Sequence, residues 1–202
     1  MSIVMTLDDV TLERLVGQAK AGDAEAFGRL FDHYHDPVYR YVASRVSRPS
    51  DAEDLTQTVF VKALEALPRY ESRGVPFGGW LFRLARNTVI DFGRTHHEHA
   101  DLDALADRAS ADVAPDDIVV TRQDIEAVAR ALAALTDEQR DAIALRFFGG
   151  LSAREAAVAM GKQEGTVRGL QFRAIAALRR QLGLSEIDGL EVAGHRAVRP
   201  QR

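Results

Sequence analysis

A basic segment near the C-terminal end of the chain carries side chains of types that can bind nucleic acids. In the stretch GTVRGLQFRA, helical spacing of about 100° per residue places Val167, Leu170 and Ala174 on one narrow face. Phe172 falls roughly 130° away from that face, on the side that carries Arg168. Arginine recognises guanine and phosphate, and an exposed ring can contact a thymine methyl group. The pattern predicts a helix held by its apolar face, with DNA as the candidate ligand of its outer face.

A second basic and aromatic cluster lies between Arg73 and Arg94. Four arginines oppose one acid, Asp91, and are interleaved with aromatic residues, namely Phe77, Trp80, Phe82 and Phe92. Cations follow the phosphates of a single strand, and aromatic rings stack on its unpaired bases. The same pattern is typical of a core helix with buried rings and solvated arginines. Taken alone, this second interpretation is favoured.

Helices must position both clusters, because helical periodicity dominates the chain and strand signals are scarce. An apolar stripe runs through residues 12–46, where Pro37 is expected to kink or restart the helix. The next helix is predicted to begin with Ser50 or Asp51 as its cap and to end at Pro68. A loop rich in glycine and proline follows, and helical spacing resumes from Trp80.

A second compact unit is predicted near the C-terminal end, after an acidic stretch with few large apolar side chains. Its helices are expected over residues 124–135, 137–148, 153–160 and 163–182. Thr136 caps the second helix, Ser152 and Glu155 form a capping box, and Gly161 separates the last two helices. These two helices make a helix-turn-helix pattern, whose second helix enters the major groove in DNA-binding proteins. An ordinary helical hairpin with solvated arginines is the alternative.

Composition excludes several classes of function. Because the sequence has no cysteine, it has no disulfides, thiolate catalysis or cysteine-ligated zinc. No apolar run approaches the roughly 20 residues that span a bilayer, and the first residues lack a secretory signal, so a soluble cytoplasmic protein is expected. The stretch HHEH, with His96, His97 and His99, is interpreted as a solvated helix end rather than a metal site. Without a glycine-rich phosphate loop or a nucleophile motif, neither a cofactor nor enzymatic activity is expected.

The order of these segments resembles one family. The stretches YHDPVYRYVASRV, DAEDLTQTVFVKAL and WLFRLARNTVIDFGR resemble the second conserved region of the extracytoplasmic-function group (group IV) of sigma-70 factors. The stretch LTDEQRDAIALRFFGGLSAREAAVAMGKQEGTVRGLQFRAIAALRR resembles the fourth region. The resemblance implies an all-α fold of two small helical domains, the second with a helix-turn-helix. The domains would span residues 1–95 and 124–184, with a flexible acidic linker at 96–123 and a tail at 185–202.

The resemblance also implies the function and the residues that perform it. A sigma factor directs core RNA polymerase to promoters and helps to open them. Its implied partners are core polymerase (the largest-subunit clamp helices and the flap), promoter DNA and an anti-sigma factor, without membrane insertion. The residues matching the clamp-helix contact are Asp54, Leu55, Gln57, Thr58 and Phe60. Those matching the minus-ten contact, where Asn87 and the preceding loop hold a flipped base, are Arg73, Phe77, Trp80, Arg83, Arg86, Asn87 and Arg94. Those matching the minus-thirty-five contact are Lys162, Glu164, Thr166, Arg168, Phe172 and Arg173.

This sequence departs from the usual family pattern at two places. Thr58 stands where a glutamate is usual, which removes a carboxylate from the clamp-binding helix. Gly169 and Leu170 replace a frequent Ser-Arg pair in the recognition helix, and Leu170 is expected to pack rather than to read DNA. The alternatives are a stand-alone helix-turn-helix regulator that binds DNA as a dimer, a helical adaptor that contacts only proteins, and a metal-dependent enzyme using His96 and His97.

Overall fold

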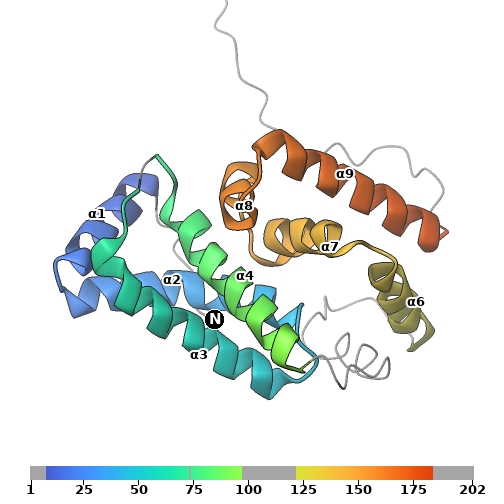
Figure 1. Ribbon diagram of the computed structural model, residues 1–202, viewed down its shortest axis with the longest axis horizontal. Helices are drawn as coiled ribbons and strands as arrows, with labels where there is room; N and C mark the ends of the chain where they lie inside the picture. The colour runs from blue at the N-terminus through green and yellow to red at the C-terminus, as the bar shows by residue number, and fades with distance from the viewer. Residues whose placement is uncertain (1–7, 73, 97–121, 184–202) are drawn as a thin grey trace, which may run out of the picture.

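All regular elements in the part of the chain that the structure describes are helical (Figure 1). The computed structural model describes residues 8–72, 74–96 and 122–183. The N-terminal group comprises α1 (Asp9–Lys20), α2 (Ala24–Ala43), α3 (Pro49–Ala66), the short 3-10 helix η1 (Leu67–Arg69) and α4 (Phe77–His96). The C-terminal group comprises α6 (Arg122–Ala133), α7 (Asp137–Ile143), the π-helical turn η2 (Ala144–Phe148), α8 (Ala153–Met160) and α9 (Glu164–Gln181). The expected all-α fold is confirmed.

Local signals fix the ends of the helices in the C-terminal group. At the start of α7, the Thr136 hydroxyl oxygen accepts a hydrogen bond from the Gln139 backbone N–H. The Gln139 side-chain oxygen accepts one from the Thr136 backbone N–H, which completes a capping box. Ser152 and Glu155 form the second box at the start of α8, as predicted. Gly161 ends α8 with φ +63°, a left-handed conformation that glycine adopts without steric cost. The turn of the helix-turn-helix is therefore set locally.

In the N-terminal group, the possible restart at Pro37 and the expected cap of the following helix are wrong. The helix α2 runs through Pro37 without a restart, because Val38, Tyr41 and other residues of its last turns are fully buried and hold it in place. The helix α3 begins at Pro49, with neither Ser50 nor Asp51 as its cap. Proline is favoured at the first helical position, where its missing N–H would have no helical partner.

The N-terminal group packs α2 and α4 against α3, and α1 against α2. Its core is made of fully buried apolar side chains, which include Leu15, Leu30, Val38, Tyr41, Val59, Leu81 and Phe82. In the C-terminal group, α9 packs on α6, α7 and α8. A small separate core of Leu135, Ile143 and Ala174 joins α6, α7 and α9.

The two groups also pack against each other. The helix α4 lies along α8, and α2 contacts η2, so that α4 and α8 lie between α3 and α9 (Figure 1). A single cluster of buried residues extends across this boundary, from Phe82 in α4 to Leu145 and Ala156 in the C-terminal group. The predicted acidic linker, apart from its first and last residues, and the predicted tail from residue 185 lie outside the described residues.

Candidate nucleic-acid and protein interfaces

The helix α9 presents a ring and two arginines to solvent. Phe172 is 75% exposed, which confirms the projection made from the sequence. Val167, Leu170 and Ala174 are buried and attach the helix to its group, so Leu170 packs as expected. This face is unusual because a large aromatic side chain gains nothing for folding when it remains in water. Its exposure makes this face of α9 a candidate contact surface.

Intramolecular ion pairs restrain the polar residues around this face. The Arg168 Nη2 atom lies 2.5 Å from the Glu164 Oε1 atom, one helical turn earlier. Arg173 is exposed and lies over Gly169, where an added Cβ atom would be 3.6 Å from its Nη1 atom. Thr166 is exposed on the same helix. That distance is an ordinary van der Waals contact, so a Cβ atom at position 169 would also leave Arg173 room to lie along the helix.

Among the residues predicted to contact the minus-thirty-five DNA, Lys162 is partly buried and bound to another helix of the C-terminal group. Its Nζ atom lies 2.7 Å from the Glu138 Oε1 atom of α7, and the side chain is partly buried. This ion pair joins the turn of the helix-turn-helix to α7. Lys162 therefore positions the recognition helix in this structure, in addition to any contact with DNA.

The helix α4 carries three of the predicted minus-ten residues on its exposed side. Arg83, Asn87 and Arg94 are all exposed. Positions 83 and 87 are one turn apart and therefore neighbours on the helix surface. The structure thus brings together a cationic and amide-bearing strip suited to phosphates and base edges. Arg73 lies outside the described residues.

The aromatic residues of this segment do not form an exposed stacking surface. Phe77 is buried between Tyr34 and Tyr70, with ring centroids 5.6 Å away in each case, so its predicted role as a direct DNA contact is not supported by this structure. Phe82 is also buried. Trp80 is partly exposed and packs against Tyr70, with centroids 4.8 Å apart. The core-helix interpretation is therefore correct for the two phenylalanines, because they fill the space between α4 and its neighbours.

Arg86 points away from the exposed strip and binds the C-terminal group. Its Nε atom donates to the Asp141 Oδ2 atom of α7 at 2.8 Å. Arg45, just after α2, places its Nη2 atom 3.2 Å from the Asp141 Oδ1 atom. Burial raises the pKa of the neighbouring Tyr41 well above its usual range, and the Asp141 carboxylate adds to this shift. Arg86, which was predicted to contact DNA, is thus bound to a carboxylate of its own chain.

Sequence reasoning missed Arg45 and Asp141. The signal for Asp141 was an acid directly before the apolar stretch AIAL, in a segment whose residues 141 to 145 are all buried. A charged group among buried residues requires a partner of opposite charge. No pattern in the sequence indicates its partners, because only packing between the two groups brings Asp141 to Arg45 and to Arg86, which lies 55 residues earlier.

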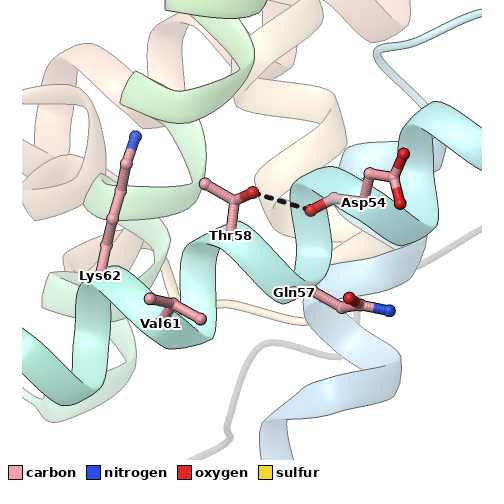
Figure 2. Close-up of a pocket in the computed structure, with 5 residues that line it drawn as sticks. All are labelled: Asp54, Gln57, Thr58, Val61 and Lys62. Atoms are coloured by element: carbon pink, nitrogen blue, oxygen red, sulfur yellow. Dashed lines mark hydrogen bonds between the residues drawn. The ribbon is translucent and has the colours of Figure 1, made fainter.

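The outer face of α3 combines polar and apolar side chains. Asp54, Gln57 and Thr58 are exposed there and line a pocket with Val61 and Lys62 (Figure 2). The Thr58 hydroxyl donates to the Asp54 carbonyl oxygen at 2.9 Å, so it is bonded to its own helix. Val61 and Lys62 thus extend the predicted polymerase-binding surface towards the end of α3.

Two of the five residues predicted on this face are in the core. Leu55 and Phe60 are buried, and Phe60 packs against Phe31 with ring centroids 4.6 Å apart. Because both side chains face the core, they offer a partner little direct surface in this structure, and their roles as contacts stay predictions. Sequence reasoning missed Val61, which is 56% exposed, and Leu64. Both lie outside the apolar stripe of Leu55, Val59, Ala63 and Leu67. An apolar residue outside the buried stripe of its helix is expected to be exposed, and this was the sequence signal for Val61 and Leu64.

Other candidate chemistry is not found in the described residues. No group of three or more histidine and acidic side chains in the part of the chain that the structure describes is arranged to hold a metal ion. His97 and His99 lie outside that part. None of the described helices is long and apolar enough to cross a membrane.

Known proteins match this arrangement over most of its length. The Sigma-70 region 2 family matches residues 30–98, and the Sigma-70, region 4 family matches residues 131–180. The chain is 38% identical to the ECF RNA polymerase sigma factor BldN of Streptomyces coelicolor, over 87% of this chain and 67% of that protein. It is 36% identical to the ECF RNA polymerase sigma factor ShbA of Streptomyces griseus, over 85% of this chain and 96% of that protein.

A solved structure extends the similarity to the fold. CnrH in complex with the cytosolic domain of CnrY has a TM-score of 0.66 and 27% identity, over 87% of this chain and 99% of that chain. Both conserved regions are thus present, in the order and at the separation that the sequence indicated. The chain belongs to the extracytoplasmic-function group of the sigma-70 family of RNA polymerase sigma factors.

Proposed function

We propose that this sigma factor, which directs core RNA polymerase to promoters, divides the task among three helices. The observation that carries the proposal is the exposed Phe172 between Arg168 and Arg173 on α9, the second helix of the helix-turn-helix. In such motifs the beginning of the second helix lies in the major groove. We therefore assign minus-thirty-five recognition to α9, with Thr166 and Glu164 at the start of that helix.

The helix α4 provides the minus-ten contact. Arg83, Asn87 and Arg94 on its exposed side offer cations for phosphates and an amide for a base edge. Trp80, partly exposed at the beginning of the helix, is the aromatic side chain available to an unstacked base. Arg86 joins this strip only when its bond to Asp141 is broken.

The helix α3 provides the contact with the clamp helices of the polymerase. Asp54 and Gln57 are its polar contacts, and Val61 with Leu64 supply the apolar area that a stable protein interface needs at its centre. Phe147 and Phe148 in η2 are exposed on the C-terminal group and suit the flap. Both assignments give a use to apolar side chains that folding leaves in water.

Regulation and location follow from the same family. We assign the chain a non-catalytic role in the cytoplasm, controlled by an anti-sigma factor. The similar protein CnrH was solved together with the cytosolic domain of CnrY. An inhibitor that holds the two groups together would cover α4 and keep it from promoter DNA.

Run-off transcription with core polymerase on a genomic promoter library tests this function. Wild-type protein is expected to produce transcripts absent with core polymerase alone. Phe172→Ala and Arg168→Ala are expected to reduce those transcripts, whereas Arg180→Ala, at the exposed end of the same helix, serves as the matched control. The absence of any sigma-dependent transcript, or equal effects of all three substitutions, would contradict the assignment.

A further inference from the structure

The two helical groups are in close contact where α4 begins. A Cβ atom added to Gly79 would lie 3.2 Å from the Glu155 carbonyl oxygen and 3.2 Å from the Val158 Cβ atom. Glycine at this position therefore lets the backbone of α4 pack directly on α8, the first helix of the helix-turn-helix (Figure 1). Arg154 extends the contact by donating from its Nη2 atom to the Gly74 carbonyl oxygen.

A buried cluster of charges lies deeper in the same interface. Asp141 is only 2% exposed, and its carboxylate contacts Arg86 at 2.8 Å and Arg45 at 3.2 Å. Both arginines belong to the N-terminal group, whereas the carboxylate belongs to the C-terminal group. One acid is thus shared by two guanidinium groups, and its contacts depend on the two groups being docked.

We propose that Asp141 is an intramolecular latch, which docks the helix-turn-helix group on α4 and occupies Arg86 in the free protein. A carboxylate and a DNA phosphate offer an arginine the same charged acceptor, so binding of one excludes binding of the other. In the latched chain Arg86 is withheld from promoter DNA without any inhibitor protein, whereas Arg83, Asn87 and Arg94 stay exposed. This inference rests on the proposed function of α4 in minus-ten recognition.

The chemistry of the cluster makes the latch reversible. Desolvation offsets much of the attraction between buried ions, so the cluster specifies the docked arrangement more than it stabilises it. Separation of the two groups returns all three charges to water. A phosphate that binds Arg86, or a polymerase surface that binds the C-terminal group, therefore shifts the population to the open form.

The first test measures the separation of the two groups in the full chain. Because the sequence has no cysteine, Val10→Cys in α1 and Arg179→Cys in α9 accept one dye pair for energy transfer. Asp141→Asn removes the charge at nearly constant volume, and it is expected to lower the transfer efficiency. Circular dichroism verifies that helix content is retained. An efficiency equal to that of the labelled parent would overturn the latch.

The second test measures the affinity of the free chain for single-stranded DNA, to which Arg86 is expected to contribute when it is released from Asp141. The probe is a fluorescent single-stranded deoxyoligonucleotide of mixed sequence, added to the free chain. Asp141→Asn is expected to tighten binding about 10- to 100-fold, as follows when the competent form is about 1–10% populated in the parent. The matched control adds Arg86→Ala to the same chain and is expected to remove the gain. A gain that persists in the control, or no gain at all, contradicts the proposal.

Two glycines of α4 provide a matched pair that avoids the charged cluster. An added Cβ atom at Gly93 meets nothing within 4 Å, whereas the one at Gly79 meets the backbone of α8. Alanine raises helix propensity at both positions, so neither variant should lose α4. Only Gly79→Ala is expected to lower the transfer efficiency. Equal efficiencies in the two variants would exclude this contact as the docking surface.

A reversible cross-link tests whether docking inhibits transcription. In Gly79→Cys with Val158→Cys, the two Cβ positions would lie 3.2 Å apart and must separate by a few tenths of an ångström to reach the roughly 3.5–4.5 Å of a disulfide. The disulfide then holds together the contact that Gly79→Cys alone, like Gly79→Ala, is expected to loosen. The oxidised chain is expected to lose run-off transcription with core polymerase and to regain it on reduction, while each single variant ignores the oxidant. Full activity of the oxidised chain would overturn the inhibitory role.

The tests separate the latch from the function on which it rests. If Asp141→Asn opens the chain in the energy-transfer measurement and no variant transcribes, the latch stands and the sigma function fails. If the parent transcribes and the transfer efficiency does not respond to Asp141→Asn, the function stands and the latch fails.

Discussion

In α9 the guanidinium of Arg168 donates two hydrogen bonds to one carboxylate oxygen of Glu164, from Nε at 3.1 Å and from Nη2 at 2.5 Å. The pair is exposed, so it contributes little to stability. Its consequence is functional, since it fixes the direction of an arginine on the face proposed to enter the major groove. Glu164 also reduces the positive charge that this face offers to phosphates.

Arg168→Ala is expected to weaken promoter binding by the holoenzyme. If the side chain reads guanine, the loss is about 1–3 kcal/mol and confined to one base position; a phosphate contact would instead weaken all sequences equally and lower the salt slope by about 1. Glu164→Gln keeps the shape of its residue and is expected to raise binding to unrelated duplexes, because it removes a negative charge. Competition binding across promoters altered one base at a time measures both effects. Unchanged binding in both variants would remove α9 from the DNA interface.

Phe172→Ala is expected to leave folding intact while reducing promoter-specific transcription. The ring is mostly in water, so its removal should change the free energy of unfolding by no more than about 0.5 kcal/mol. Leu170→Ala, two residues earlier, removes a buried side chain and should cost about 2–5 kcal/mol. Urea denaturation gives both values. A large loss of stability in Phe172→Ala would mean that the ring packs against another part of the chain.

Val61→Asp on α3 is expected to weaken binding to core polymerase. Loss of one apolar contact at the centre of an interface costs about 1–2 kcal/mol, which is roughly 5- to 30-fold in affinity. Val10→Asp on α1 is the matched control, because that valine is 77% exposed and lies outside the proposed contact. Competition with a labelled sigma factor for core polymerase measures the difference. Equal affinities for the two variants would contradict the assignment of α3.

Stability is expected to fall as the pH falls below about 6.5, and His33 is expected to contribute to the fall. Burial lowers the pKa of this histidine in the folded chain. The unfolded chain therefore binds a proton first, and its population rises as the pH decreases from about 6.5 towards the folded value. His33→Gln removes this contribution and should flatten the dependence. Urea midpoints across the range from about pH 7.5 to pH 5.5 test this prediction; identical slopes for the parent and the variant would contradict it.

The residues that the sequence placed correctly depend on local rules. Ser152 and Thr136 cap their helices because each hydroxyl bonds the backbone three residues later. Phe172 is exposed because helical spacing separates it from the anchoring residues. At Leu55, helical periodicity and the family resemblance pointed in different directions. Periodicity places Leu55 in the apolar stripe of α3, the resemblance places it in a partner contact, and its burial agrees with the stripe. Val61 was missed because helical periodicity assigns no role to an apolar residue that lies outside the buried stripe.

The sequence by itself determined the helical class, the caps of α7 and α8, the helix-turn-helix and the family, because spacing and local hydrogen bonds act over a few residues. Only the tertiary structure decided which candidate residues are available. Phe77 is buried by the rings of Tyr34 in α2 and of Tyr70 just after η1, and Arg86 is bound by Asp141 from the other helical group. Long-range docking sets these contacts, and no periodicity in the chain encodes a pairing across fifty residues. The physical reason is that a buried charge must find its counter-ion wherever packing places it.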